Sequence, residues 1–167
     1  MNETPSAGTV VAGLGNPLMG DDGLGLVALE ILRDSWNFQP EVELMDGGTW
    51  GMNLLPLIES AERVLLLDAI KAGAAPGTVV VLERDDLPRF FSTKLSPHQI
   101  DMREVLALAE LRGTLPDDIV AIGLQPELVE MSTELSATLR DNLDSLVDRV
   151  IRQLRDWGHE ARRNAAE

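Results

Sequence analysis

Apolar residues in this chain fall into short continuous runs, separated by segments with helical spacing. The runs Thr9 to Leu14, Arg63 to Ala69, Val79 to Leu82 and Ile119 to Leu124 are almost entirely apolar, with many β-branched or leucine side chains. Such runs are typical of strands that are covered on both faces. Val42 to Met45 alternates more weakly, so we expect this strand nearer the edge of the sheet.

Two other segments have the spacing of amphipathic helices. Apolar residues recur every three to four positions from Gly23 to Leu32 and from Leu135 to Leu154, and Gly158 ends the second pattern. Strands that alternate with helices predict the α/β class, as a three-layer α/β/α sandwich. The segment from Glu83 to Pro97 has neither pattern, and loops of that length in compact domains are more often functional than structural.

Length and composition predict one domain from residue 1 to 158, followed by a polar C-terminal tail from 159 to 167. The chain has 167 residues, of which 44% are hydrophobic and 25% are charged, as in ordinary globular proteins. No apolar run approaches the roughly 20 residues that a membrane helix needs. The N-terminal residues also lack the pattern of a signal peptide, so the expected location is the cytoplasm.

The charge and the reactive side chains exclude several functions. A formal net charge of −14 repels phosphate backbones and anionic lipids, so we expect neither nucleic acid nor membrane as a partner. The same charge opposes self-association, which favours a monomer. The absence of cysteine removes thiolate metal ligands and cysteine nucleophiles. Of the two histidines, His159 lies in the predicted tail, which leaves His98 for imidazole chemistry in the core.

The first strand leads into a glycine-rich turn, GLGNPLMGDDGLG, from residue 13 to 25. A turn of this kind raises the possibility of a dinucleotide site. However, Leu18 stands where the third glycine of that fingerprint is needed, and Asp21 and Asp22 would repel a pyrophosphate. The alternative is structural: either aspartate could cap the helix that is predicted to begin near Gly23.

Two further candidates for chemistry lie after the third strand and in the long loop. Asp68 follows a leucine-rich run at the carboxyl end of a predicted central strand, where an ionised carboxylate is usually paired, hydrogen-bonded or bound to metal. His98 stands in SPHQ, where Ser96 and Gln99 form a capping box. The helix dipole would keep this imidazole neutral and able to bind a cation.

Asp22, Asp68 and His98 are therefore predicted to converge at one edge of the sheet as a metal site. Two carboxylates and one imidazole suit a divalent ion of borderline hardness, such as nickel, zinc, manganese or iron. Three protein ligands leave coordination positions open, so the metal could belong partly to another molecule. The structural alternatives are a carboxylate satisfied by loop amides and a histidine with no ligand role.

At this point the motifs resemble those of the hydrogenase maturation endopeptidases, which remove a C-terminal extension from the large subunit of nickel-iron hydrogenases. The resemblance runs from Val10 to the last helix and depends on the order and spacing of several pieces together. These pieces are GLGNPLMGDDGLG, DGGTWG from Asp46 to Gly51, LLLDAI from Leu65 to Ile70, APGTVVVL from Ala75 to Leu82, KLSPHQI from Lys94 to Ile100, and GLQPELVE from Gly123 to Glu130.

The resemblance implies a twisted five-stranded, mostly parallel sheet of the phosphorylase/hydrolase-like kind, with a metal site formed by Asp22, Asp68 and His98. Relatives often carry glutamate where this chain has Asp22, which keeps the charge and shortens the reach by one methylene. The family is often classed as aspartic-type peptidases, so these three residues and Asp46 are the catalytic candidates. Asp46 has an alternative role in stabilising its glycine turn.

The resemblance also implies the substrate and the metal. The partner is the large-subunit precursor, and nickel is recognised inside that precursor rather than held tightly by the enzyme, although another divalent ion could occupy the isolated site. Cleavage could use a metal-activated water or a carboxylate base.

Three rival functions remain. GLGNP also opens peptidyl-tRNA hydrolases, but this chain lacks their tyrosine and any histidine before His98. The hypothesis of a nucleotide-binding module is supported only by the glycines Gly13, Gly15 and Gly20. A partner-binding protein with a structural metal would hold its ion tightly.

Overall fold

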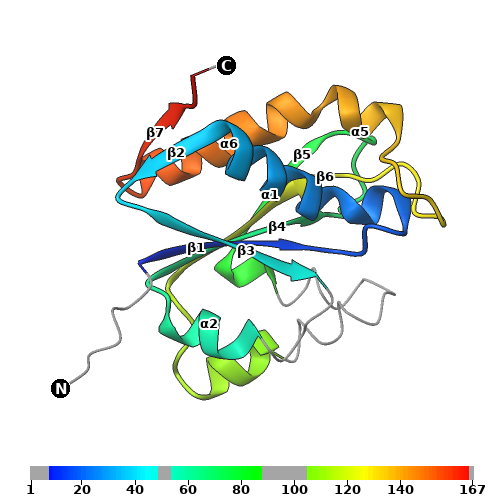
Figure 1. Cartoon of the computed structure of the whole chain (residues 1–167). Helices are drawn as coiled ribbons and strands as arrows, with labels where there is room; N and C mark the ends of the chain where they lie inside the picture. The colour runs from blue at the N-terminus through cyan, green and yellow to red at the C-terminus, as the bar shows by residue number, and fades with distance from the viewer. Residues whose placement is uncertain (1–7, 49–53, 88–104, 166–167) are drawn as a thin grey trace.

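A five-stranded sheet lies between two helical layers (Figure 1) in a computed structural model that describes residues 8–48, 54–87 and 105–165. In spatial order the strands are β3 (Val42–Gly48), β1 (Thr9–Leu14), β4 (Arg63–Ala69), β6 (Asp118–Leu124) and β5 (Val79–Glu83). The first four are parallel, and β5 is antiparallel to β6. The predicted α/β/α sandwich with a mostly parallel five-stranded sheet is therefore confirmed.

Each face of the sheet packs against its own helical layer, because side chains alternate between faces along a strand. Val11, Leu65 and Leu67 belong to a core shared with α1 (Leu24–Ser35), α5 (Ala137–Asp141) and α6 (Leu143–Asp156). Val10 and Leu66 belong to a second core, shared with α2 (Leu55–Ser60) and the helical segment 105–111. Both central strands are thus covered on two faces, which explains their continuous apolar runs.

The predicted elements match the structure closely, but β5 is an edge strand that is only partly buried, whereas its apolar run predicted a strand covered on both faces. The four apolar runs form strands whose ends lie within one residue of the prediction, and the weaker run starting at Val42 forms the edge strand β3. The last helix, predicted as continuous, is divided at Asn142 into α5 and α6. The 3-10 turn η1 (Gly20–Gly23) precedes α1, and η3 (Arg84–Asp86) begins the long loop, whose residues beyond 87 lie outside the described ranges.

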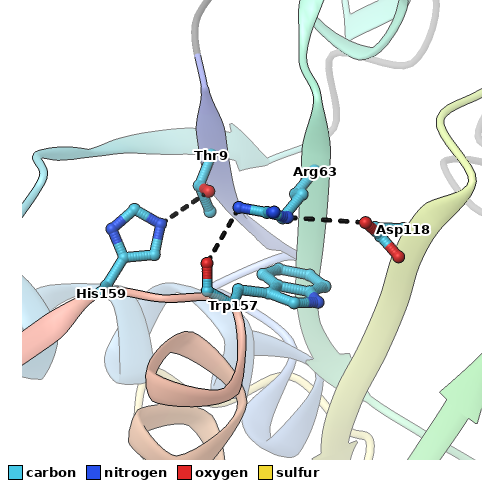
Figure 2. Close-up of polar contacts among 5 residues, drawn as sticks. All are labelled: Thr9, Arg63, Asp118, Trp157 and His159. Atoms are coloured by element: carbon cyan, nitrogen blue, oxygen red, sulfur yellow. Dashed lines mark hydrogen bonds and ion pairs between the residues drawn. The ribbon is translucent and has the colours of Figure 1, made fainter.

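The C-terminal residues form a small second sheet. β7 (Glu160–Arg163) pairs antiparallel with β2 (Trp36–Gln39), beside the cis Gln39–Pro40 peptide bond. His159 was expected in a polar tail, but it is buried. Its Nδ1 lies 2.7 Å from the backbone oxygen of Pro40 and its Nε2 lies 2.7 Å from the hydroxyl of Thr9. This part of the predicted tail is therefore attached to the start of β1 (Figure 2).

Among the described residues, no helix combines the length and the apolar character that crossing a membrane requires.

Candidate active site

Two of the predicted site residues lie near the carboxyl ends of β1 and β4. Asp22 lies in η1 and Asp68 near the end of β4, and their exposed fractions are only 6% and 2%. The turn residue Gly15 lies between them. A Cβ atom on Gly15 would be 1.8 Å from the backbone oxygen of Asp22 and 3.5 Å from Oδ1 of Asp68. The structure thus brings these two carboxylates to one edge of the sheet.

Backbone amides orient both carboxylates. The N–H of Asn16 donates to Oδ2 of Asp22 at 3.0 Å, and the N–H of Ala69 donates to Oδ1 of Asp68 at 2.9 Å. Such hydrogen bonds fix the direction of a carboxylate. Two anchored, negatively charged groups at the carboxyl ends of parallel strands can accept a proton from water or bind a divalent cation.

The glycines of the first turn permit close packing. Gly15 has φ +113°, a left-handed conformation that favours glycine, and its space is limited by Asp22. Gly25 lies at the start of α1, where a Cβ atom would approach the backbone oxygens of Leu67 and Leu14 to 2.2 and 2.3 Å. The start of α1 therefore packs directly against the backbone of β1 and β4. This packing accounts for the glycine pattern without a phosphate ligand.

Asp21 has different hydrogen-bond partners from its neighbour Asp22. Asp21 is fully buried, and it accepts hydrogen bonds from the backbone N–H groups of Glu127, Leu128 and Ser136 and from the hydroxyl of Ser136, at 2.7 to 2.9 Å. The capping alternative for α1 is wrong, because Gly23 is the N-cap and has no side-chain cap bond. Asp21 instead anchors the segment from 126 to 136 beside the site.

A second buried side chain holds the loop that follows Asp68. Gln125, directly after β6, accepts hydrogen bonds from the backbone N–H groups of Ala72 at 2.7 Å and Ala74 at 3.3 Å. Its backbone oxygen also accepts from the N–H of Gly77 at 2.8 Å. The sequence reasoning did not identify Asp21 or Gln125 as anchors. The usable signal was their position: each is a polar residue directly beside a predicted buried element.

The other two candidates are placed less centrally or not described. Asp46 is exposed on the edge strand β3, opposite Gly13 of β1, and strand alternation puts it on the same face as Leu44. Asp68 shares the opposite face with Leu66 by the same rule. His98 lies outside the described residues. Within the described ranges, no group of three or more His, Cys, Asp or Glu side chains is arranged to hold a metal ion, so the three-ligand set stays a prediction.

Comparisons with known proteins agree on one family. A family model described as HycI, hydrogenase maturation protease, matches residues 27–153. The hydrogenase expression/formation protein HupD of Rhodobacter capsulatus is 37% identical over 158 residues, which cover 93% of this chain and 75% of the relative. The hydrogenase 2 maturation protease of Escherichia coli strain K12 is 33% identical over 153 residues, covering 91% and 93%. The solved structure titled hydrogenase maturating endopeptidase HybD from E. coli has a TM-score of 0.89 and 32% identity, covering 94% of this chain and 98% of that one.

Proposed function

The chain belongs to the family of hydrogenase maturation proteases and is a peptidase, and we propose that it removes the C-terminal extension from the large-subunit precursor of a nickel-iron hydrogenase. The observation that carries this proposal is that two buried carboxylates, Asp22 and Asp68, lie beside the turn at Gly15 and Asn16. Proton transfer in peptide hydrolysis needs a group of this kind within reach of water. The net charge of −14 and the protein substrates of this family argue against the tRNA and nucleotide functions.

Nickel enters the proposal as part of the substrate. Asp22, Asp68 and His98 would occupy open coordination positions of a nickel ion that is already inserted in the precursor. Because each bond to that nickel forms only with the loaded precursor, the enzyme would bind loaded and empty precursor with different affinities. The ratio of the two affinities sets the discrimination, and a ratio of about 100 requires roughly 2.7 kcal/mol of differential binding. Cleavage would then follow nickel insertion.

For the chemical step we propose attack of a water molecule on the carbonyl carbon of the scissile peptide bond. One carboxylate, Asp22 or Asp68, takes a proton from that water as the C–O bond forms. The proton then passes to the leaving nitrogen as the C–N bond breaks. The products are the new carboxyl terminus of the large subunit and a free peptide, and no oxidant or reductant is needed. Activation of the water by nickel is the alternative route.

The decisive experiment incubates the purified protein with nickel-loaded and nickel-free precursor and follows the mass of the large subunit. We expect loss of a C-terminal peptide from the loaded precursor only, at a rate that does not change when nickel is added to the enzyme alone. Failure to cleave either precursor would refute the proposed substrate. Equal cleavage of both would leave the peptidase function in place and refute nickel sensing.

A pair of variants separates the proposed ligand role of His98 from the helix start predicted around it. His98→Ala is expected to slow processing of the loaded precursor at least about tenfold, because one contact to the metal is lost. Ser96→Ala should instead lower the unfolding free energy by about 0.5–2 kcal/mol, the usual effect of losing a helix cap, and retain activity. Parental activity of His98→Ala would remove His98 from the site.

A further inference from the structure

Exposed apolar side chains gather beside the candidate active site. Leu18, Leu128, Val129 and Met131 have exposed fractions of 60%, 49%, 55% and 89%, and these four residues are called the apolar rim below. Single exposed hydrophobic residues are common on protein surfaces, but several that adjoin one another mark an interaction site. The only other large hydrophobic residue with comparable exposure in the described ranges is Leu111, at 86%.

The apolar rim is one surface, because the two segments that carry it are joined by backbone hydrogen bonds. The N–H of Ser132 donates to the oxygen of Leu18 at 3.0 Å, and the N–H of Gly20 donates to the oxygen of Ser132 at 2.8 Å. The N–H of Asp21 donates to the oxygen of Leu128, also at 3.0 Å. Figure 1 shows the yellow connection between β6 and α5 beside the blue start of α1.

Hydrogen bonds to the buried side chain of Asp21 hold the segment that carries most of the apolar rim. The carboxylate of Asp21 binds three backbone N–H groups and one hydroxyl of the segment from 127 to 136. Asp21 is fully buried, so these charge-assisted bonds form away from solvent, where they are strong. The segment is therefore held outward in a fixed arrangement, and a surface that is already ordered loses little conformational entropy when a partner binds.

The position and charge of the apolar rim indicate what it binds. It lies next to the candidate active site, because the N–H of Leu18 donates to Oδ1 of Asn16 and the N–H of Asn16 donates to Oδ2 of Asp22. Glu127, Glu130 and Glu134 are exposed in the same segment, within a chain of net charge −14. The complementary ligand is a polypeptide with apolar side chains next to basic ones.

We propose that the apolar rim binds the segment of the precursor that flanks the scissile bond, through apolar contacts with a basic residue placed near the glutamates. This inference rests on the proposed function and adds a docking surface to it. Apolar contacts made equally in the ground state and the transition state lower KM without changing kcat. The apolar rim therefore sets affinity and selectivity for the substrate, and the carboxylates perform the chemistry.

Steady-state processing of nickel-loaded precursor tests the proposal through KM and kcat. Met131→Asp and Val129→Asp should each raise KM about tenfold, as expected when an apolar contact is replaced by a charge that must stay solvated, while kcat stays within about twofold. Met131→Leu should keep the parental KM because the apolar contact is retained. Both positions are exposed, so thermal unfolding of these variants should match the parent.

Leu111→Asp is the matched control. Leu111 is as exposed as Met131 but belongs to the helical segment 105–111, which packs with α2 on the other face of the sheet. It adds the same charge and should leave KM unchanged. Parental KM in both rim variants, or an equal rise in Leu111→Asp, would overturn the proposal. If the parent protein itself does not process the precursor, the proposed function fails first.

Binding of a dye-labelled synthetic peptide identifies the part of the precursor that occupies the apolar rim. The peptide spans the cleavage site and the extension, and its fluorescence anisotropy is titrated with each protein. We expect saturable binding by the parent and by Leu111→Asp, and binding at least about fivefold weaker by Met131→Asp. Equal binding by the parent and Met131→Asp, or no binding by the parent, would refute the flanking segment as the occupant.

Discussion

Polar side chains gather at both ends of the five-stranded sheet, but the two groups differ in what they bind. At the amino ends, Thr9, Arg63 and Asp118 occupy neighbouring register positions as the first residues of β1, β4 and β6. At the carboxyl ends, Asp22 of η1 and Asp68 of β4 lie beside the turn at Gly15 and Asn16. The strand β4 contributes a residue to both groups, Arg63 at its start and Asp68 near its end.

The amino-end group connects the two ends of the chain. Arg63 donates from its NH1 to the backbone oxygen of Trp157 at 2.9 Å, and its Nε lies 3.5 Å from Oδ2 of Asp118. The ring of His159 contacts the hydroxyl of Thr9 (Figure 2) and, on its other side, the backbone oxygen of Pro40. In this group the cation of Arg63 lies beside the anion of Asp118, and the hydrogen-bond donors face acceptors. The group therefore stabilises the attachment of the C-terminal residues to the sheet.

The carboxyl-end group contains two buried carboxylates, each held by a backbone N–H. Among the described residues it contains no cation like Arg63 of the amino-end group, so the two groups differ in composition. Buried carboxylates in a crevice at strand ends are typical of functional sites. The comparison leads to a testable rule: changes at the carboxyl ends should alter activity, and changes at the amino ends should alter stability.

The largest effect is expected for Asp68→Asn. The amide keeps the shape and the acceptor for the N–H of Ala69 but removes the charge. Processing of loaded precursor should fall about 100-fold or more, since a general base or metal ligand is lost. The unfolding free energy should stay unchanged or rise, because the amide removes a buried charge and keeps the hydrogen bond from Ala69. Rates from mass spectrometry and a denaturant titration give both values, and a parental rate would remove Asp68 from the chemistry.

The fold and part of this site could be predicted from the sequence because both depend on clear local patterns of apolar and polar residues. The runs that became β1 and β4 are apolar on both faces, and Asp68 stands at the end of the second run, where the parallel arrangement places ligands. The small sheet could not be predicted. In β2 and β7 only Phe38 and Ala161 are buried, so neither strand has a clear apolar pattern. Their pairing joins segments more than a hundred residues apart.

Asp21 and Asp22 show where sequence reasoning about the site ends. They are adjacent and chemically identical, yet the side chain of Asp21 bonds to Ser136, which is 115 residues away, while that of Asp22 accepts from the N–H of Asn16 in the turn beside Asp68. Only the tertiary structure distinguishes an anchor from a site residue here. Similarly, His159 was assigned to a tail because its neighbours are polar, and its burial depends on contacts with Pro40 and Thr9.

His159→Gln tests the amino-end group and should have an intermediate effect. Pro40 offers a carbonyl, so Nδ1–H of His159 donates to it and Nε2 bonds to Thr9. Glutamine cannot span both partners in the same geometry, and one buried polar group would lose its bond. The unfolding free energy should fall by about 1–3 kcal/mol, which is about 2–4 °C in Tm for each kcal/mol.

The processing rate of His159→Gln should equal that of the parent once both proteins are fully folded, because the substitution lies at the opposite end of the sheet. Arg162→Gln is the control in the adjoining strand β7, since the side chain of Arg162 is 81% exposed and pairs with the exposed Glu160. It should change the unfolding free energy by less than about 0.5 kcal/mol. Loss of activity in His159→Gln at unchanged stability would break the proposed division between the two ends.

The smallest effect is expected for Asp118→Asn, although Asp118 belongs to the same group. Its side chain is 57% exposed and that of Arg63 is 35% exposed, so water screens the ion pair between Nε and Oδ2. Arg63 keeps its hydrogen bond to the backbone oxygen of Trp157 after the substitution. Denaturant titration should therefore show a loss below about 0.5 kcal/mol, and the difference should shrink further at high salt. A loss as large as that of His159→Gln would mean that the charge of Asp118, rather than the buried hydrogen bonds of His159, attaches the C-terminal residues to the sheet.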